Sequence, residues 1–354
     1  MSKNAKTLAG IAVVVIIAIA AYFGFTHTGS KSTSEKTIQD LKVYFVPSKQ
    51  PDQIITMTKP LKGLLIEQLK KEGYDVKNVD IKVGTSYEAA GEALTSGTAD
   101  VGFIPGGTYV MYQDGAQALL TATRAGLNKD SADAAKWNDG KPTEKTDKQV
   151  STYRSILIAG PSAKGQELAK KVNAGEKLTW DDLNSAKWGL SSTTSSAGYI
   201  YPSLWLDKRY GKTVADLKNT VTVDSYGSGM ARLAAGQIDI LPAYADARSD
   251  FAKMWTTDYQ QPKSIWAETN VIGVSQNIYN DTISVSKKSK IMTPAFQKAL
   301  SQAFINLAKT PEGKKVIAIY SHEGYVPAKS SNYRSEEHTS EPSHIASSRM
   351  PSSA

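Results

Sequence analysis

Short apolar runs alternate with segments of helical periodicity in the first part of the chain. Three of these runs predict buried strands: Leu41–Pro47, Val79–Gly84 and Ala99–Gly107. Between the first two, Leu61–Lys71 carries leucines on one face and predicts a helix that stops at Gly73. A second helix is predicted from Ser86 to a glycine cap at Gly97. This strand–helix–strand–helix–strand order predicts a parallel sheet with helices on its faces.

The same plan returns in the second half, after a polar stretch. Residues 127–151 are rich in Lys, Asp and Asn, and we expect them to form a surface excursion. Strands, some running into loops, are then predicted over Tyr153–Gly160, Lys187–Leu190, Thr220–Gly229, Gln237–Asp246 and Ser264–Ser275. Helices are predicted over Leu178–Leu183, Leu204–Tyr210, Met230–Gly236 and Thr293–Tyr320. The pattern indicates an α/β protein, whose ligand is expected beyond the carboxyl ends of the strands.

The N-terminal residues predict export of the folded body. Residues 1–7 carry two lysines, and an uncharged apolar run follows at residues 8–25. This run is just long enough for a membrane anchor, and it also fits a signal peptide with small residues at Ala18–Ala20. Because lysines mark the cytoplasmic side, both interpretations put the body outside the cell, anchored on the extracellular face of the membrane or secreted. Residues 26–37 then form a polar tether.

The last residues, 334–354, differ from the body in composition. Their apolar residues are sparse and show no period, which predicts disorder. The stretch RSEEHTSE resembles the translation of a sequencing adapter. We therefore interpret this tail as an artefact that replaces the native C-terminal segment, and we assign it no function.

Composition narrows the chemistry. The 354 residues carry a formal net charge of +8, which favours anionic surroundings or serves solubility alone. Cysteine is absent, so disulfides, thiolate zinc sites and thiol nucleophiles are excluded. Of four histidines only His322 lies in the predicted folded part, which argues against a metal cluster or a Ser-His-Asp triad. We expect no catalytic residue, no metal and no cofactor. No basic block with interleaved aromatics indicates nucleic-acid binding.

The stretch SSTTSSAGYIYP contains six consecutive hydroxyl side chains. A polar linker would lead into polar sequence, whereas this run lies between a predicted strand and an apolar segment that ends in a predicted helix. The order puts Ser195 and Ser196 at the start of a helix, where backbone N–H groups lack partners and favour anions. Ala197 and Gly198 allow an anion to approach the backbone closely. The run thus predicts an oxyanion site, and an ordinary N-cap is the simpler alternative.

Four ordered motifs resemble the phosphonate/phosphate/phosphite-type solute-binding proteins of ABC importers: YRSILIAG, DDLNSAKWGLSSTTSSAGYIYP, SYGSGMARLAAGQIDI and NDTISV. The resemblance covers about residues 41–333. It implies a two-lobed α/β fold of the type II periplasmic-binding-protein class, with a hinge and a ligand cleft between the lobes. The implied lobes are 38–152 plus 276–333, and 153–275. It also implies a monomer that captures a phosphorus oxyanion and delivers it to an ABC permease in the membrane.

The resemblance further implies ligand-binding residues in the phosphate turn, after the second strand and at two acidic positions: Thr194, Ser195, Ser196, Ala197, Gly198, Tyr87, Asp246 and Asp281. Ala197 replaces the third hydroxyl of the family's turn, although its N–H still donates. For Tyr87, an ordinary half-buried aromatic is the alternative.

The two acidic positions need a physical reason, because a carboxylate repels an oxyanion unless a proton or cation lies between them. Asp246 and Asp281 satisfy this if they bind a ligand ammonium group, or if one accepts a hydrogen bond from a protonated P–OH. The alternative is an aspartate that bonds its own turn. Arg154 is a further candidate for the anion site, with a surface ion pair as its alternative. The sequence departs from the family at two places: Gly229 stands where the family has a histidine, and Ile104–Pro105 where it has an aromatic residue. The identity of the ligand therefore stays open.

Two classes of function remain. The first is a capture protein without catalytic activity, and the alternative is an enzyme or a ligand sensor on the same bilobal scaffold. Gly227-Ser228-Gly229 is not a G-x-S-x-G nucleophile elbow, and no histidine is placed to serve as its base. A sensor would carry a signalling domain, for which the chain has no room. We therefore predict capture for an importer.

Overall fold

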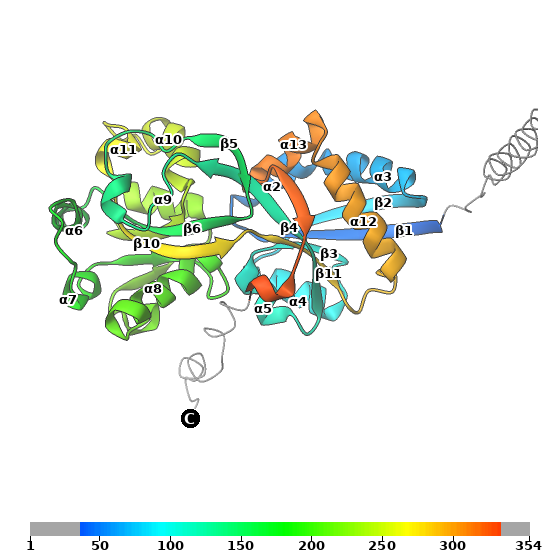
Figure 1. Ribbon diagram of the computed structural model, residues 1–354, viewed down its shortest axis with the longest axis horizontal. Coiled ribbons are helices and arrows are strands. Elements are labelled where there is room, and N and C mark those ends of the chain that lie inside the picture. The colour runs from blue at the N-terminus through cyan, green and yellow to red at the C-terminus, as the bar shows by residue number, and fades with distance from the viewer. Residues whose placement is uncertain (1–35, 334–354) are drawn as a thin grey trace, which may run out of the picture. The chain divides into compact units, whose positions relative to one another are not determined.

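Residues 36–333 are the part of the chain that the computed structural model describes (Figure 1). The predictions for the apolar run at 8–25, for the tether up to residue 35 and for the tail at 334–354 lie outside this part. Within 36–333, no helix combines the length and the apolar content needed to cross a bilayer.

A seven-stranded sheet is built from both ends of the described sequence. Its strands are β1 (Lys36–Phe45), β2 (Tyr74–Val83), β3 (Val101–Ile104), β4 (Ala116–Leu127), β5 (Lys145–Val150), β11 (Thr282–Ser286) and β12 (Gly324–Pro327). They follow the order β12-β4-β11-β3-β1-β2, and β5 pairs with β4. β1 and β3 are parallel, with Val43 opposite Val101, as the sequence pattern predicts. We call this sheet and its helices lobe 1.

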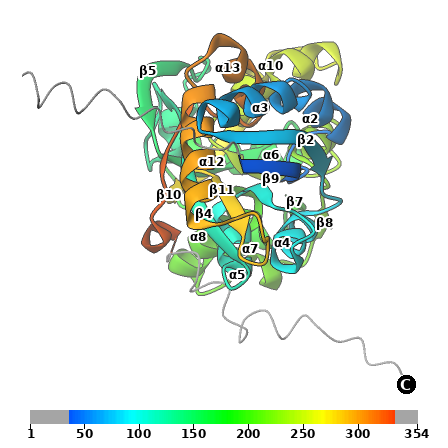
Figure 2. The same cartoon turned by 90° about the vertical axis from the view of Figure 1, so that its right-hand side faces the viewer.

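The helices of lobe 1 are α2 (Pro51–Thr58), α3 (Leu61–Lys71), α4 (Tyr87–Ser96), α5 (Gly106–Tyr112), α12 (Pro294–Leu307) and α13 (Pro311–Ile317). The predicted bounds of α3 are confirmed. So are the caps of α4: the Ser86 hydroxyl accepts from the Ala89 N–H at 3.0 Å, and Gly97 takes the left-handed φ of 83°. α12 packs along α3 and across β4 and β12 (Figure 2). α2, α3, α12 and α13 bury one apolar core, in which the rings of Phe45 and Phe103 stack at 4.4 Å, and α4 and α5 bury a second one.

A five-stranded sheet, with its helices, forms lobe 2. Its order is β10 (Asn270–Tyr279), β6 (Thr152–Ala159), β9 (Ile240–Tyr244), β7 (Trp188–Leu190) and β8 (Thr220–Thr222). The helices are α6 (Ala163–Asn173), α7 (Trp180–Asn184), α8 (Tyr201–Tyr210), α9 (Tyr226–Ala234), α10 (Ala247–Thr257) and α11 (Ile265–Glu268). Short single turns occur at Ala134–Trp137, Ser196–Ile200, Val214–Asp216, Ala318–Tyr320 and Ser330–Tyr333.

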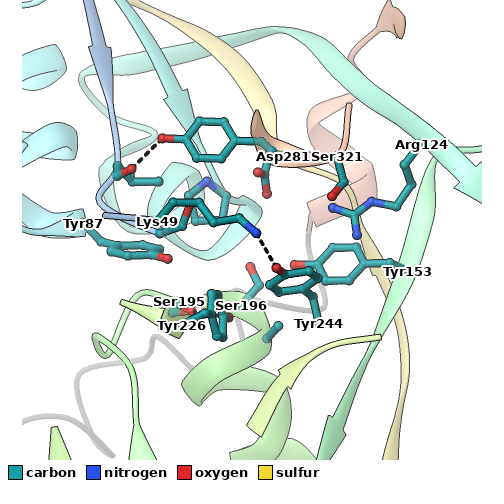
Figure 3. A pocket seen from close by; sticks show the side chains of 15 residues that line it. Lys49, Tyr87, Arg124, Tyr153, Ser195, Ser196, Tyr226, Tyr244, Asp281 and Ser321 are labelled. Carbon is teal, nitrogen blue, oxygen red and sulfur yellow. Dashed lines mark hydrogen bonds between the residues drawn. The ribbon is translucent and has the colours of Figure 1, made fainter. Parts of the chain in front are cut away.

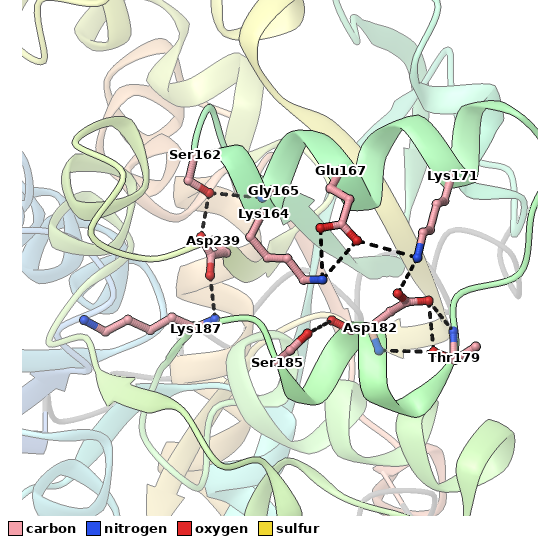
Figure 4. Close-up of polar contacts among 10 residues, drawn as sticks. All are labelled: Ser162, Lys164, Gly165, Glu167, Lys171, Thr179, Asp182, Ser185, Lys187 and Asp239. Atoms are coloured by element: carbon pink, nitrogen blue, oxygen red, sulfur yellow. Dashed lines mark hydrogen bonds and ion pairs between the residues drawn. The ribbon is translucent and has the colours of Figure 1, made fainter.

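Side-chain caps begin α6 and α7 of lobe 2 (Figure 4). Ser162 begins α6: its hydroxyl accepts from the Gly165 N–H at 3.0 Å and donates to Asp239 at 2.6 Å. The second oxygen of Asp239 accepts from the Lys187 N–H at 2.7 Å, which ties β7 to β9. Thr179 caps α7, as predicted from the sequence.

Two sequence-based predictions were wrong in part. Ser264–Ser275 was expected to be strand, but Ile265–Glu268 is helical, because Ile265 is buried under α10 and Glu268 accepts from the Trp255 indole at 2.8 Å. Residues 127–151 are more than a surface excursion, since they include β5 and a fully buried Trp137. Trp137 belongs to the apolar core of lobe 2, so this part of the excursion packs on lobe 2.

The chain crosses between the sheets twice, after β5 and after β10. Asn280 lies at the second crossing and bonds both hinge segments. Its amide donates to the carbonyls of Ala122 and Val150 at 3.0 Å each, and its backbone N–H donates to Ser151 at 2.9 Å. The hinge thereby fixes the neighbouring Asp281.

Candidate ligand-binding site

A cavity of about 50 Å³ lies where the two lobes meet (Figure 3). Its walls come from strand ends, helix starts and the hinge of both lobes. The lining residues are Val46, Ser48, Lys49, Tyr87, Pro105, Arg124, Tyr153, Ser195, Ser196, Ala197, Tyr226, Tyr244, Asp281, Tyr320 and Ser321. Hydroxyl groups predominate among them, joined by two cations and one carboxylate.

The hydroxyl turn after β7 supplies the lobe 2 wall. Ser195 is the N-cap of a wide helical turn, and its hydroxyl accepts from the Gly198 N–H at 3.2 Å. The N–H groups of Tyr199 and Ile200 both bond the Ser195 carbonyl at 3.1 Å, so the turn is widened before α8 begins. Pro202 lies in the first turn of α8, where a missing N–H costs nothing. The widened turn thus separates the cap at Ser195 from α8.

Arg124 brings a positive charge to the cavity from β4. It is buried, its Nη1 donates to Asp246 at 2.9 Å, and its guanidinium lies 4.4 Å from the centre of the Tyr153 ring. Burial, the largest single effect, would lower the pKa of Arg124, but Asp246, Tyr153, Asp281 and Tyr244 together outweigh it and raise the pKa. Its Nε is buried without a hydrogen-bond partner among residues 36–333. Arg124 therefore keeps a donor for a further acceptor.

Lys49 is the second cation, on the loop that follows β1. Its ammonium donates to the Tyr244 hydroxyl at 2.6 Å and to Asp250 at 2.9 Å, so it bridges from lobe 1 to lobe 2. Tyr244 donates to the same Asp250 oxygen at 2.8 Å. This triad closes one side of the cavity.

The phenols of the cavity are neutral donors. Burial is the main cause that raises the pKa of Tyr87, Tyr244 and Tyr320 well above the usual 10, and it raises that of Tyr226 to about 12. The negative charge of Asp281 adds to the effect on Tyr87, Tyr226 and Tyr320. These groups therefore stay protonated at neutral pH.

Asp281 is the one carboxylate that lines the cavity within the described residues. Its side chain is 19% exposed, and its Oδ2 lies 3.5 Å from Nε2 of the buried His322. The other ring nitrogen of His322 lies 3.3 Å from the Tyr325 hydroxyl. The arrangement puts an acceptor opposite the hydroxyl donors of the turn.

The structure brings five of the predicted residues to the cavity: Tyr87, Ser195, Ser196, Ala197 and Asp281. The other three do not line it. Thr194 faces lobe 1, with its hydroxyl 3.1 Å from that of Thr108. Gly198 packs behind the turn, where a Cβ would meet the Ser191 hydroxyl at 2.3 Å. Asp246 is buried behind Arg124 as its counter-ion.

Arg154, the further candidate, and Gly229, which stands where the family has a histidine, do not line the cavity. Arg154 forms an ion pair with Asp130 at 2.6 Å, which is the alternative weighed for it. Gly229 packs into the core, where a Cβ would meet Leu241 at 2.8 Å. A histidine has no room at that position.

Sequence reasoning missed much of the cavity's polar wall: Lys49, Arg124, Tyr226, Tyr244, Tyr320 and Ser321. Only Arg124 carried a usable signal. A single arginine inside the apolar strand of TATRAGL indicates a buried charge that needs a partner.

Comparisons with solved structures show a shared fold at low sequence identity. A binding-protein component of an ABC phosphonate transporter from Pseudomonas aeruginosa matches with a TM-score of 0.61 and 13% identity, covering 88% of this chain and 89% of that one. PhnD1 from Prochlorococcus marinus, solved in complex with methylphosphonate, matches with a TM-score of 0.61 and 15% identity over 87% and 98%. A Xanthomonas citri protein bound to ATP matches at 0.59 and 14% over 86% and 96%.

A comparison with curated protein sequences found no significant match. The sequence profile of a family described as "ABC transporter, phosphonate, periplasmic substrate-binding protein" matches residues 43–333, which is most of the chain. The family consists of extracytoplasmic transport proteins that bring a small molecule to a membrane permease. The two-lobed α/β fold agrees with this match. The chain belongs to the phosphonate family of periplasmic substrate-binding proteins of ABC transporters.

Proposed function

We propose that the chain captures a small phosphorus oxyanion, namely phosphate, phosphite or a short alkylphosphonate, and delivers it to an ABC permease without catalysis. The observation that carries this is the convergence on one cavity of the Ser195–Ser196 hydroxyls, the free Nε of Arg124 and the acceptor Asp281. An enzyme or sensor is less well supported, because the Ser195 hydroxyl accepts from the Gly198 N–H at 3.2 Å and lies 3.4 Å from the Tyr226 phenol, and neither group is a general base.

The size of the cavity supports a small ligand. One buried water needs roughly 10–15 Å³ of cavity, so about 50 Å³ holds only a handful of heavy atoms. A tetrahedral anion with at most one short substituent fits this volume. The relative from Prochlorococcus marinus was solved with methylphosphonate, an anion of this size.

Asp281 supports a ligand that carries a proton. Two arrangements fit a carboxylate beside an oxyanion: a ligand ammonium group, or a P–OH that donates to Asp281. The small volume favours the P–OH, because an aminoalkyl arm adds several heavy atoms. A phosphorus oxyanion whose second pKa is about 6, as in phosphate esters, exchanges its last proton close to neutral pH, so that Asp281 can select the protonated form. Sulfate carries no such proton and should be rejected.

The remaining features of the proposal concern the whole chain. We propose a monomer in which the segment around Trp137 packs on lobe 2. Because β10 pairs with β6 as far as Tyr279, lobe 1 resumes after Tyr279 and not at the expected residue 276. The body is held outside the cell by the apolar run at 8–25 or released if that run is cleaved.

Calorimetric titration with phosphate, phosphite, methylphosphonate and sulfate tests the proposal. Ser195→Ala and Ser196→Ala should each weaken binding of the phosphorus anions about tenfold or more, because a hydrogen bond to a charged group contributes roughly 1.5–3 kcal/mol. Ser162→Ala is the matched control, since it removes a helix cap of lobe 2 away from the cavity. A wild-type protein that binds none of the three phosphorus anions would overturn the proposed function. Equal binding of sulfate and phosphate would overturn the role of Asp281.

A further inference from the structure

The hydroxyl run contacts lobe 1 as well as the cavity. Ser192, Thr193 and Thr194 all donate to one carboxylate oxygen, Oε1 of Glu88, the last two at 3.3 Å each. Glu88 lies in the first turn of α4, directly after Tyr87, and does not line the cavity. The run therefore presents Ser195 and Ser196 to the cavity and residues 192–194 to Glu88.

The contacts hold Glu88 in its charged form. Burial alone would raise the pKa of Glu88, but hydrogen bonds from Ser192, from its own backbone and from Ser86 and Thr194 lower it below the ordinary 4.5. Hydrogen bonds to an ionised acceptor are roughly twice as strong as neutral ones. Three such donors from one loop make this a substantial link between the lobes.

Two neighbouring contacts join the same loop to lobe 1. The Gly107 N–H donates to the Ser196 hydroxyl at 3.0 Å, and the Thr108 hydroxyl donates to the Thr194 carbonyl at 3.3 Å. Both contacts are between neutral groups, whereas Glu88 is charged. All of them come from the starts of α4 and α5, and all require the lobes to be together.

We propose that Glu88 is a positioning residue that docks residues 192–194 onto lobe 1 and thereby holds Ser195 and Ser196 against the bound anion. The proposal rests on the proposed function for the identity of the ligand. It accounts for the length of the hydroxyl run, because one turn must supply hydrogen-bond donors both to the anion and to the Glu88 carboxylate of the opposite lobe. In an open form, Glu88 and its three donors would bond to water instead.

Dissociation kinetics of methylphosphonate test the role of Glu88. Glu88→Ala should speed dissociation at least tenfold, whereas association stays within about twofold, because the contacts form only after the lobes meet. Glu88→Gln should lie between Glu88→Ala and the wild type, since its amide oxygen still accepts but without charge. Glu92→Gln is the matched control, because it removes the same charge at an exposed position one turn further along α4. Glu88→Ala combined with Ser192→Ala should dissociate no faster than Glu88→Ala alone.

A second readout is independent of the ligand. Because the chain has no cysteine, Lys70→Cys on α3 and Lys170→Cys on α6 give one label on each lobe. Without ligand, the wild type should show a population with the short label distance of the closed form, and Glu88→Ala should reduce it at least threefold. If the wild type binds methylphosphonate, an unchanged dissociation rate in Glu88→Ala overturns the proposal. If no phosphorus anion binds, the proposed function fails, and an absent or unchanged closed population then overturns the role of Glu88 by itself.

Discussion

Arg124 is the most informative residue to change, because it serves both the fold and the cavity. Arg124→Met removes the donor that faces the cavity and leaves Asp246, only 2% exposed, as a buried charge without its partner. Breaking a buried pair in this way typically costs about 3–5 kcal/mol of unfolding free energy. The single variant should therefore be less stable and bind weakly, and it cannot separate the two effects.

The double variant Arg124→Met with Asp246→Leu separates them. Replacing both members of a buried ion pair by apolar groups of similar size is often neutral for stability, so most of the lost unfolding free energy should return. Affinity for phosphate should stay lower than that of the wild type by about tenfold to a hundredfold, the loss expected for one charge-assisted hydrogen bond of roughly 1.5–3 kcal/mol. Chemical denaturation measures the first quantity and calorimetric titration the second. A stable double variant that binds phosphate like the wild type would refute the role of Arg124 in binding.

Three further results are expected. Tyr226 has a pKa raised from 10 to about 12, so its contribution to stability is complete below pH 10 and is lost as the pH rises to about 12. Tyr226→Phe should therefore reduce the alkaline loss of unfolding free energy by roughly 2–3 kcal/mol. An unchanged loss would contradict the burial of Tyr226 as a neutral phenol. Gly198→Ala should lower the melting temperature by the equivalent of about 1–3 kcal/mol, because its Cβ would meet Ser191 at 2.3 Å, whereas equal melting would show that the turn yields. Saturating phosphate should reduce the radius of gyration in small-angle scattering, and a constant radius would indicate a rigid site.

Much of the fold followed from local pattern. Leu61–Lys71 is an amphipathic helix with a glycine after it, and Ser86 and Gly97 carry the residue types that cap α4. These signals lie within one element, so periodicity and cap chemistry suffice to find them. β11 is different, because it inserts between β3 and β4 from far along the chain. No local feature of the sequence specifies such a pairing.

The same limit applied to the cavity. The hydroxyl turn was predictable because its residues are consecutive. Lys49, Tyr244 and Asp250, by contrast, meet only when the lobes fold together, and nothing in the sequence beside any of them indicates the other two. Trp137 was missed for a related reason: the sequence around it is polar and gives no sign that its side chain packs in the core of lobe 2. Sequence pattern thus finds the parts of a site that one element supplies.

The positive and negative side chains around the cavity nearly cancel, so an anion must be bound by hydrogen bonds more than by net charge. The charged groups that line the cavity or pair with its residues are Lys49, Arg124, Asp246, Asp250 and Asp281. Three carboxylates thus oppose two cations, so net Coulomb attraction does not draw an anion inward. Hydroxyl and N–H dipoles must then supply the binding energy, and burial, which raises the pKa of Tyr87 and of Tyr226, keeps these two phenols protonated as donors.

Salt provides a direct test of this reasoning. Screening acts strongly on exposed net charge and weakly on buried dipoles, and the Debye length falls from about 30 Å at 0.01 M salt to about 8 Å at 0.15 M. Although the whole chain carries a formal +8, affinity for phosphate should therefore change less than about threefold between these concentrations, measured by calorimetry in sodium chloride. Lys208→Gln, an exposed change on α8, should leave the affinity unaltered at both salt concentrations. A tenfold or larger loss of affinity with salt would mean that net positive charge, and not the hydroxyl turn, holds the ligand.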